Sequence, residues 1–342
     1  MTDRKSLIFA TIFAVCLLAG FAVRDHNVKV KAARLAQEGT PTPYFPAGSV
    51  WTQDVSNAPV DAHSQNIIDW LAGDGGWGRG RMQIDFSMRV LKADASTPTL
   101  PFHPGDQFYL PDSDLIKTIP LPPDGGIESG SGYECNIDDN DCHLIVVDRS
   151  QGKLYEAYQA NLVKNAISAT FVGVWDLNRV YPPSGRGEQC TSADAAGFPI
   201  APLLFNADEL ASGSINHAIR FILPNQRIRA GVYVRPATHA GGPRGPANAP
   251  PYGAHLRLKS SFDMSQLSAP AKVVARAMQK YGMFLADGGN LALTAESDED
   301  TQMKYSDLGF GPHDLQALKV SDFEVLELGN LIRLTNDCVR NK

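Results

Sequence analysis

The sequence predicts a mainly β protein, a single large domain with a β-sandwich or jelly-roll-like core and a few helices packed outside it. Several short runs between residues 84 and 328 have the patterns of β-strands. In some of these runs apolar residues alternate with other residues, and in others apolar residues predominate. The 23 prolines and 30 glycines fall largely between these runs, which is typical of strands joined by loops. Segments with helical periodicity are few, and we find no internal repeat.

Composition and charge narrow the class of protein. The chain has 342 residues, 43% of them hydrophobic and 20% charged, which is ordinary for a soluble globular domain with a sizeable core. The formal net charge is −6, which gives no basic footprint, so nucleic acid is not expected as a partner. The same sign disfavours adhesion to anionic lipid, apart from the N-terminal segment.

The N-terminus carries an export signal. Arg4 and Lys5 precede an uninterrupted apolar run from Leu7 to Val23, a length between that of a signal peptide and that of a membrane-spanning helix. Residues 1–23 are therefore expected to be a signal peptide or an N-terminal membrane anchor. Either predicts a secreted, periplasmic or extracellular protein. Residues 24–43 are polar, end in Thr-Pro-Thr-Pro and predict a linker, so the β-rich extracytoplasmic domain is expected over residues 44–342.

Four cysteines outside this segment agree with an oxidising compartment. We expect a local disulfide, Cys135–Cys142, and a long-range one, Cys190–Cys338, although the other two pairings stay open. A zinc site is the competing interpretation, but the chain has no C-x-x-C pair.

The first elements lie before residue 132. A helix is expected over 64–71, with Ser64 as its cap, and a strand over 84–90, where apolar and polar residues alternate. Residues 101–132 are rich in Pro, Asp and Gly. This segment is long for a structureless connection, so we expect it to wrap the surface or line a site.

A hairpin over residues 143–158 is the most informative segment. Alternation places Leu144, Val146 and Asp148 on one face of its first strand, and it places Glu156 within the second. A buried carboxylate is costly unless it is paired, hydrogen-bonded or protonated. Together with Asp176 on a later strand, these residues predict an open, polar sheet face.

Further elements are expected towards the C-terminus. Strands are predicted over 170–176, 217–223, 231–235, 255–259 and 322–328. Helices are predicted over 269–281, with Ser268 as cap, and over 312–318.

Short motifs occur along most of the chain after the linker. They are FPA, W, DVS and PVD (45–61), HLIVVD and LYE (143–156), WDL (175–177), TSADAAGFPI (191–200), HAIRF (217–221), PATH (236–239), LRLK (256–259), and YG with LAD (281–287). In this order they resemble a family of exported bacterial proteins of unassigned activity, and T-S-A-D-A-A-G is the most specific of them. The resemblance implies an exported globular domain and transfers no reaction; the Cys135–Cys142 insert departs from the family pattern.

Carboxylates are the main candidates for chemistry. Glycoside hydrolysis needs two carboxyl groups across one bond, and neighbouring strands of one sheet face provide such spacings. The catalytic candidates are Glu156, Asp176, Asp148 and Asp194, within an acidic set that also includes Asp287. The alternative for Asp148 is a turn residue before Arg149-Ser-Gln-Gly152, and structural roles stay open for Glu156 and Asp176.

Other side chains would bind the substrate. His239 and Arg257 are expected to orient it, and Trp175 and Tyr158 to stack against sugar rings. His239 belongs to a scattered set with His143, His217 and His255, which has no metal-binding spacing. Ser192 in T-S-A-D lacks the G-x-S-x-G context of a hydrolase nucleophile and is better explained as a helix or turn cap.

The loop between Cys135 and Cys142 is acidic. Asp138, Asp139 and Asp141 offer the oxygen ligands that calcium prefers, but the EF-hand spacing is absent. Calcium is therefore a candidate cofactor, with a solvated acidic loop as the alternative; no other metal or cofactor is expected.

Two functions follow from these residues. The first is an extracytoplasmic carbohydrate-active protein, a glycoside hydrolase that uses paired carboxylates. The second is a non-catalytic surface or matrix protein that binds glycan or assembles with itself. In both, the partner is a polysaccharide or cell-surface glycan, and the membrane is contacted only through the N-terminal segment.

Overall fold

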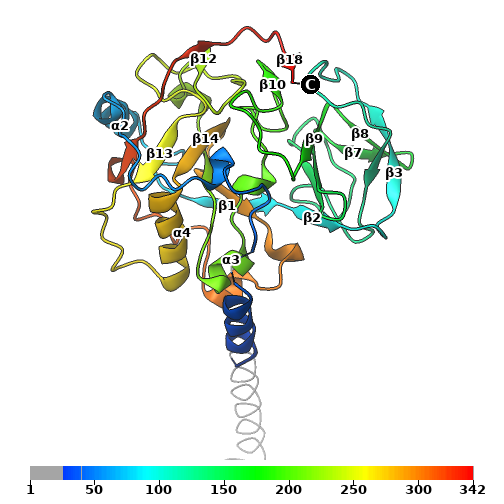
Figure 1. Cartoon of the computed structure of the whole chain (residues 1–342), viewed down its shortest axis with the longest axis horizontal. Helices are drawn as coiled ribbons and strands as arrows, with labels where there is room; N and C mark the ends of the chain where they lie inside the picture. Colours follow the sequence, from blue (N-terminus) through cyan, green and yellow to red (C-terminus); the bar gives the residue numbers. More distant parts are fainter. Residues whose placement is uncertain (1–25, 40, 342) are drawn as a thin grey trace, which may run out of the picture.

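The computed structural model describes residues 26–39 and 41–341, and its strands form three larger β-sheets and two short ribbons (Figure 1). The largest sheet is six-stranded and mixed. Its strand order is β1 (Ile84–Met88), β15 (Leu293–Glu296), β11 (Ile219–Leu223), β14 (Met283–Gly288), β13 (His255–Leu258) and β16 (Phe323–Val325).

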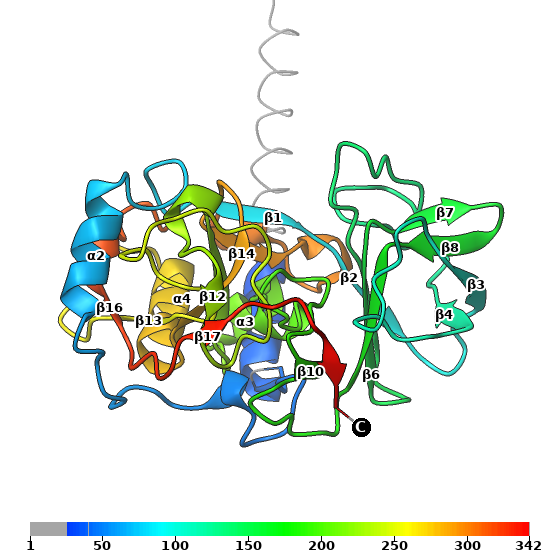
Figure 2. The same cartoon turned by 90° about the horizontal axis from the view of Figure 1, so that it is seen from above.

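Two four-stranded sheets lie to one side of it (Figure 2). The first has the order β2 (Val90–Ala93), β5 (Leu144–Asp148), β6 (Lys153–Tyr158) and β9 (Phe171–Asp176). The second has the order β4 (Thr118–Pro120), β3 (Thr99–Pro104), β8 (Ala166–Ala169) and β7 (Asn161–Val163). Two short ribbons pair β10 (Gly187–Glu188) with β18 (Val339–Arg340), and β12 (Val232–Tyr233) with β17 (Ile332–Arg333).

The β-rich class is confirmed, but a sandwich or jelly roll is not. Jelly rolls are built from antiparallel strands. In the described part of the chain, parallel pairs join β1 to β15, β11 to β14, β2 to β5 and β3 to β8.

Helices pack around the large sheet. They are α2 (Ser64–Gly73), α3 (Ala207–Ser212) and α4 (Ala269–Lys280), with short 3-10 helices at Val50–Thr52, Ala201–Leu203, Asn225–Arg227, Asp298–Asp300, Tyr305–Leu308 and Val320–Asp322. The predicted helix at 269–281 is confirmed, and the Ser268 side chain caps it by accepting a hydrogen bond from Ala271 N. The helix expected at 312–318 is wrong: this segment forms successive turns.

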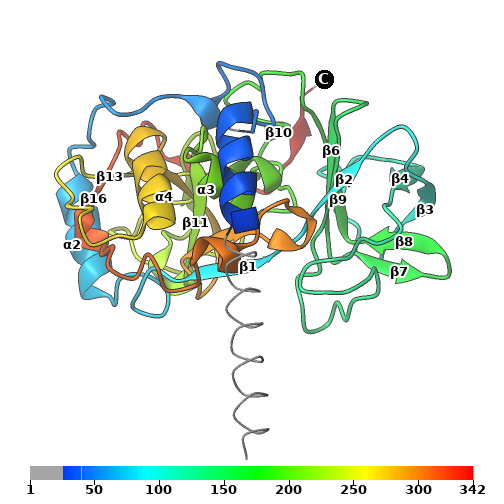
Figure 3. The same ribbon diagram turned by 90° about the horizontal axis from the view of Figure 1, so that it is seen from below.

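The segment expected as a linker is helical over residues 26–38, and it lies on the same side as α3 and α4 (Figure 3). Leu35 is only 5% exposed, and Val28 and Ala32 pack against the main core. Polar composition concealed this helix because three apolar side chains, spaced three or four residues apart, suffice for one buried stripe. The apolar run 7–23 lies outside the described residues, within which no helix is long and apolar enough to cross a membrane.

The predicted strand at 84–90 is two strands in two sheets. Ile84 pairs with Leu293 in the six-stranded sheet, whereas Val90 pairs with Ile145 in the neighbouring one. The chain changes sheet at Arg89, whose guanidinium donates to Asp300 Oδ2 at 2.6 Å. Continuous alternation in the sequence gave no sign of this change, because both halves keep a two-residue period.

The hairpin at 143–158 is confirmed, with Val146 opposite Tyr155. The predicted alternation along β5 is also confirmed. Ile145 and Val147 belong to the main hydrophobic core, whereas Leu144 and Val146 belong to a second hydrophobic core on the other face of the strand. The expected open polar face is wrong: a hydrophobic core covers each face of β5, and all five of its residues are buried.

Both expected disulfides are confirmed. Cys135–Cys142 closes a short loop, and Cys190–Cys338 joins residues 148 positions apart. Disulfides of this kind are compatible with an extracytoplasmic protein.

Candidate functional site

A cleft of about 500 Å³ lies where the end of β14 meets the start of β5 and the end of β6. This volume is typical of small-molecule sites. Four carboxylates, two histidines and two tyrosines line it: Asp112, Asp141, Asp194 and Asp287, His143 and His239, and Tyr109 and Tyr158. Among the described residues that line the cleft, none is a lysine or an arginine.

Arg220 on β11 holds two of these carboxylates. Its Nη2 lies 2.6 Å from Asp194 Oδ2 and 3.5 Å from Asp287 Oδ2, and its Nη1 donates to Thr294 Oγ1 at 2.7 Å. Arg220 is 1% exposed, whereas the Asp287 side chain keeps 27% exposure and faces the cleft. A buried cation of this kind requires a carboxylate partner, and here it has two.

The loop that carries Asp194 is fixed by local hydrogen bonds. Ser192 Oγ accepts from Asp194 N at 2.9 Å and donates to Phe198 O at 2.6 Å, and Asp194 Oδ1 accepts from Ala196 N at 3.1 Å. Ser192 is therefore a turn cap, as its sequence context indicates, and its hydroxyl proton is engaged by a carbonyl.

The two carboxyl groups on Arg220 both have raised pKa values. Burial raises the pKa of Asp194, with the neighbouring Asp287 carboxylate acting in the same direction, and burial also raises the pKa of Asp287. Burial and a neighbouring carboxylate both favour the protonated form of such a group, and Arg220 opposes them. Asp194 makes the shorter contact with Arg220, whereas Asp287 is held more loosely and borders the cleft.

A second ion pair borders the cleft. His143 Nδ1 lies 2.7 Å from Glu128 Oε2, and His143 Nε2 lies 3.1 Å from Ala193 O. Burial lowers the pKa of His143, but the Glu128 carboxylate outweighs burial and raises the pKa of His143 to about 9. In the same way, burial raises the pKa of Glu128, but His143 outweighs burial and lowers the pKa of Glu128 to about 2.

This pair predicts a pH-dependent contribution to stability. Because its pKa is raised, His143 stabilises the folded state fully below its ordinary pKa of 6.5, and this contribution is lost as the pH rises through about 9. Because its pKa is lowered, Glu128 stabilises the folded state above its ordinary pKa of 4.5, and this contribution is lost as the pH falls towards about 2. The gap in unfolding free energy between the wild type and His143→Gln should therefore be largest between pH 4.5 and 6.5 and should shrink by pH 10. Urea unfolding at pH 6 and pH 10 measures it, and a gap that widens at pH 10 would contradict the assignment.

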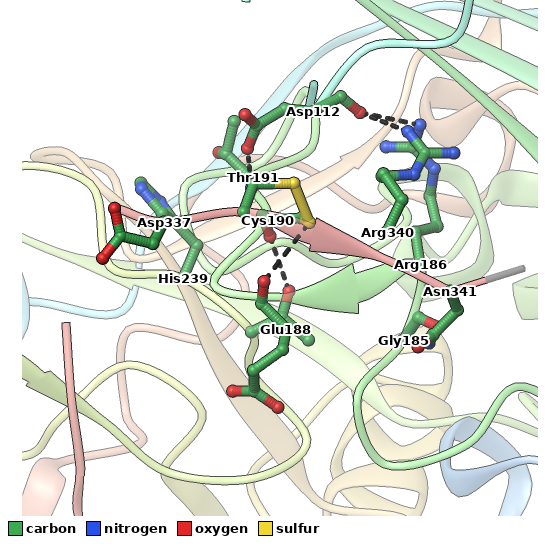
Figure 4. Close-up of a disulfide and its surroundings, with 12 residues drawn as sticks. Asp112, Gly185, Arg186, Glu188, Cys190, Thr191, His239, Asp337, Arg340 and Asn341 are labelled. Atoms are coloured by element: carbon green, nitrogen blue, oxygen red, sulfur yellow. Dashed lines mark hydrogen bonds between the residues drawn. A yellow bond between two sulfur atoms is a disulfide. The ribbon is translucent and has the colours of Figure 1, made fainter. Parts of the chain in front are cut away.

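The rim of the cleft is partly built by the C-terminal segment. Cys190–Cys338 anchors this segment, and Asp112 accepts from Thr191 N at 2.7 Å and, through its carbonyl, from Arg340 (Figure 4). The anchored segment brings Asn336 Oδ1 within 3.2 Å of His239 Nε2. The disulfide thus fixes one wall of the cleft.

Three of the predicted catalytic and substrate-binding residues line this cleft: Asp194, His239 and Tyr158. Tyr158 donates to Asp141 Oδ1 at 3.4 Å, and burial raises the pKa of its hydroxyl to about 12, so the phenol stays neutral. Asp141, expected as a calcium ligand, is therefore a cleft residue, whereas Asp138 and Asp139 are exposed on the loop and do not line the cleft.

The other three carboxylates predicted to be catalytic, Glu156, Asp148 and Asp176, do not line the cleft. Glu156 is 0% exposed and accepts hydrogen bonds from Ile200 N, Ala201 N and Trp175 Nε1. Asp148 is equally buried and begins the turn after β5, where its Oδ1 accepts from Ser150 Oγ and Gln151 N. These contacts favour structural roles, which the sequence left open.

Asp176, Trp175 and Arg257 are likewise elsewhere. Asp176 is exposed and accepts from Asn178 N in the turn after β9. Trp175 is 2% exposed within the core, too buried to stack on a sugar. Arg257 is bound by Glu324 and by the carbonyls of the loop between residues 55 and 58.

Arg220 and Glu128 were not predicted from the sequence as site residues. The sequence does contain an indication of the role of Arg220. It is a single cation within the apolar run Ala218-Ile-Arg-Phe-Ile222, and a buried cation requires an acidic partner. Glu128 gave no such indication, since it lies in the irregular segment 101–132. That segment does line the cleft, as expected, through Tyr109, Leu110 and Asp112.

One group of potential metal ligands occurs among the described residues, formed by Asp112, Cys190 and Cys338. The two cysteines form a disulfide with each other, so their sulfurs are not thiolate ligands.

Five segments that carry the family resemblance converge at this cleft. HLIVVD provides His143, TSADAAGFPI provides Asp194, PATH provides His239 and LAD provides Asp287, while HAIRF provides the Arg220 behind them. Comparison of the chain with protein-family models, with curated proteins and with solved structures gives no match.

Proposed function

We propose that the protein is an extracytoplasmic glycoside hydrolase whose active site is the cleft beside Arg220. One observation carries this proposal: two carboxyl groups share one buried guanidinium, and the more weakly held of the two, Asp287, opens to the cleft. A general acid requires a carboxyl group with a raised pKa, and burial raises the pKa of Asp287.

The same cleft offers a second carboxylate. Asp141 precedes β5, lines the cleft and lies near enough to Asp287 and His143 to influence the charge of both. In the proposed reaction Asp287 protonates the glycosidic oxygen as its bond to the anomeric carbon breaks. Asp141 accepts a proton from the water that forms the new bond to that carbon.

The charge of the cleft favours neutral or positively charged sugars. Four aspartates line it, and the basic side chains that line it are histidines. Uronic acid polymers would meet carboxylates with no guanidinium or ammonium group to bind them.

Replacing Asp287 by asparagine tests the acid. The substitution keeps the shape of the side chain but removes the proton donor, so kcat on a neutral polysaccharide should fall by about 10²- to 10⁴-fold. Asp263→Asn is the matched control, because Asp263 is exposed, accepts hydrogen bonds from Ser265 in its own turn and is not among the residues that line the cleft. Full activity of Asp287→Asn, or loss in Asp176→Asn instead, would overturn the assignment.

A non-catalytic glycan-binding protein is the second candidate. Tyr109 is 39% exposed and Leu110 is 60% exposed at the edge of the cleft, where they would suit contact with a sugar ring or with a second copy of the chain. A wild-type protein that binds neutral polysaccharides without cleaving any of them would favour this candidate over the hydrolase.

A further inference from the structure

Both ring nitrogens of His143 face oxygen acceptors. Nδ1 contacts the Glu128 carboxylate at 2.7 Å, and Nε2 contacts the Ala193 carbonyl, which can only accept, at 3.1 Å. Glu128 also accepts from Ser87 Oγ at 3.0 Å and from the backbone N–H of His143, as an ionised carboxylate does. A neutral imidazole has one N–H and satisfies one of these acceptors; the imidazolium satisfies both.

The two contacts join separate parts of the chain. Glu128 belongs to the loop before β5, His143 directly precedes β5, and Ala193 directly precedes Asp194. The ring is 3% exposed, so water does not replace either contact.

We propose that His143 is a positioning residue of the cleft: as an imidazolium it holds the Asp194 loop against β5 and sets a fixed positive charge beside Asp287. The inference rests on the proposed function only for the role given to Asp287 as an acid. The geometry itself is independent of the substrate.

Loss of the proton from His143 would remove one of the two bonds. The Glu128 contact keeps the remaining N–H at Nδ1, so Nε2 would turn a lone pair towards the Ala193 carbonyl and repel the Asp194 loop. Carboxyl groups surround the ring and oppose this loss, and the Tyr158 ring lies 5.6 Å away. The carboxyl groups that interact electrostatically with this ring are Glu128, Asp141, Asp287 and Glu156.

The first test uses the full wild-type chain. Nitrogen NMR of the histidine rings should show both nitrogens of His143 protonated at pH 7, and a single alkaline transition should move the carboxyl signal of Asp287 together with the ring signals. A neutral His143 tautomer at pH 7 would overturn the proposal. This measurement needs no variant, so it holds even where a substitution prevents folding.

The second test compares His143→Gln with His217→Gln. His217 is also buried and paired with a glutamate, Glu209, at 3.2 Å, but it does not line the cleft. The pKa of Asp287, followed by its carboxyl carbon signal, should rise in His143→Gln because the carboxylate loses a neighbouring cation, and it should stay unchanged in His217→Gln. Equal values in all three proteins would overturn the proposal.

The two proposals fail in different ways. A protein that cleaves no glycan contradicts the hydrolase but leaves both NMR results intact. A neutral His143 contradicts the positioning role while turnover, where present, continues to depend on Asp287.

Discussion

Replacing Glu156 by alanine is expected to lower the free energy of unfolding by about 3–5 kcal/mol. Its Oε1 accepts from Ile200 N at 2.8 Å and from Ala201 N at 2.9 Å, and its Oε2 accepts from Trp175 Nε1 at 3.0 Å. All three donors are buried, so truncation leaves each without an acceptor. Urea unfolding measures the loss.

Glu156→Gln is the matched control for this substitution. Its carbonyl oxygen still accepts from Ile200 and Ala201, while its amide faces the Trp175 N–H, so the loss should be about 1–3 kcal/mol. Burial raises the pKa of Glu156 to about 7, and the three donors oppose this, so both charge states occur near neutral pH. An alanine variant within about 1 kcal/mol of the wild type would show that Glu156 is not the structural acceptor described above.

Replacing Arg220 by methionine is expected to cost about 3–5 kcal/mol, because a buried ion pair loses one partner and leaves the other uncompensated. Asp194 is 0% exposed and would keep only the hydrogen bond from Ala196 N, and Asp287 would lose the same cation. The loss should be greater at pH 8 than at pH 5, since protonation removes the unpaired charges at the lower pH. Urea unfolding at both pH values measures it.

Two variants make this prediction specific. Arg235→Met removes an arginine whose pair with Glu188 is at the surface, with side-chain exposures of 32% and 39%, and it should cost less than about 1 kcal/mol. Asp194→Asn added to Arg220→Met should recover part of the loss, because it removes the buried charge that the arginine compensated. A double variant no more stable than Arg220→Met alone would contradict the pairing.

The hairpin at 143–158 shows how far a local pattern leads. A two-residue period fixed which side chains share a face, and those faces are confirmed. The same pattern gave no information on what covers each face. The carboxylates of Glu156 and Asp148 therefore suggested an open polar surface, although buried backbone and side-chain donors satisfy them.

The candidate site was likewise predicted only in part, because its residues come from separate parts of the chain. The sequence identified Asp194, His239 and Tyr158, and it placed Asp287 and His143 in larger sets of acids and histidines. It gave no means of choosing among these members, because the choice depends on β11 and β14 lying side by side and on His143, which precedes β5, lining the same cleft as Asp287.

The sequence by itself determined the β-rich class, the hairpin with its two faces, helix α4 and its cap, and the even number of cysteines from which two disulfides form, while the structure settled their pairing. These depend on residue periodicity, capping chemistry and cysteine number, which are local or few in number. Tertiary structure alone decided the mixed sheets, the change of sheet at Arg89 and the pairing of Arg220 with Asp194 and Asp287. Desolvation and the distance between residues far apart in the chain set those pairings, and both quantities exist only once the chain has folded.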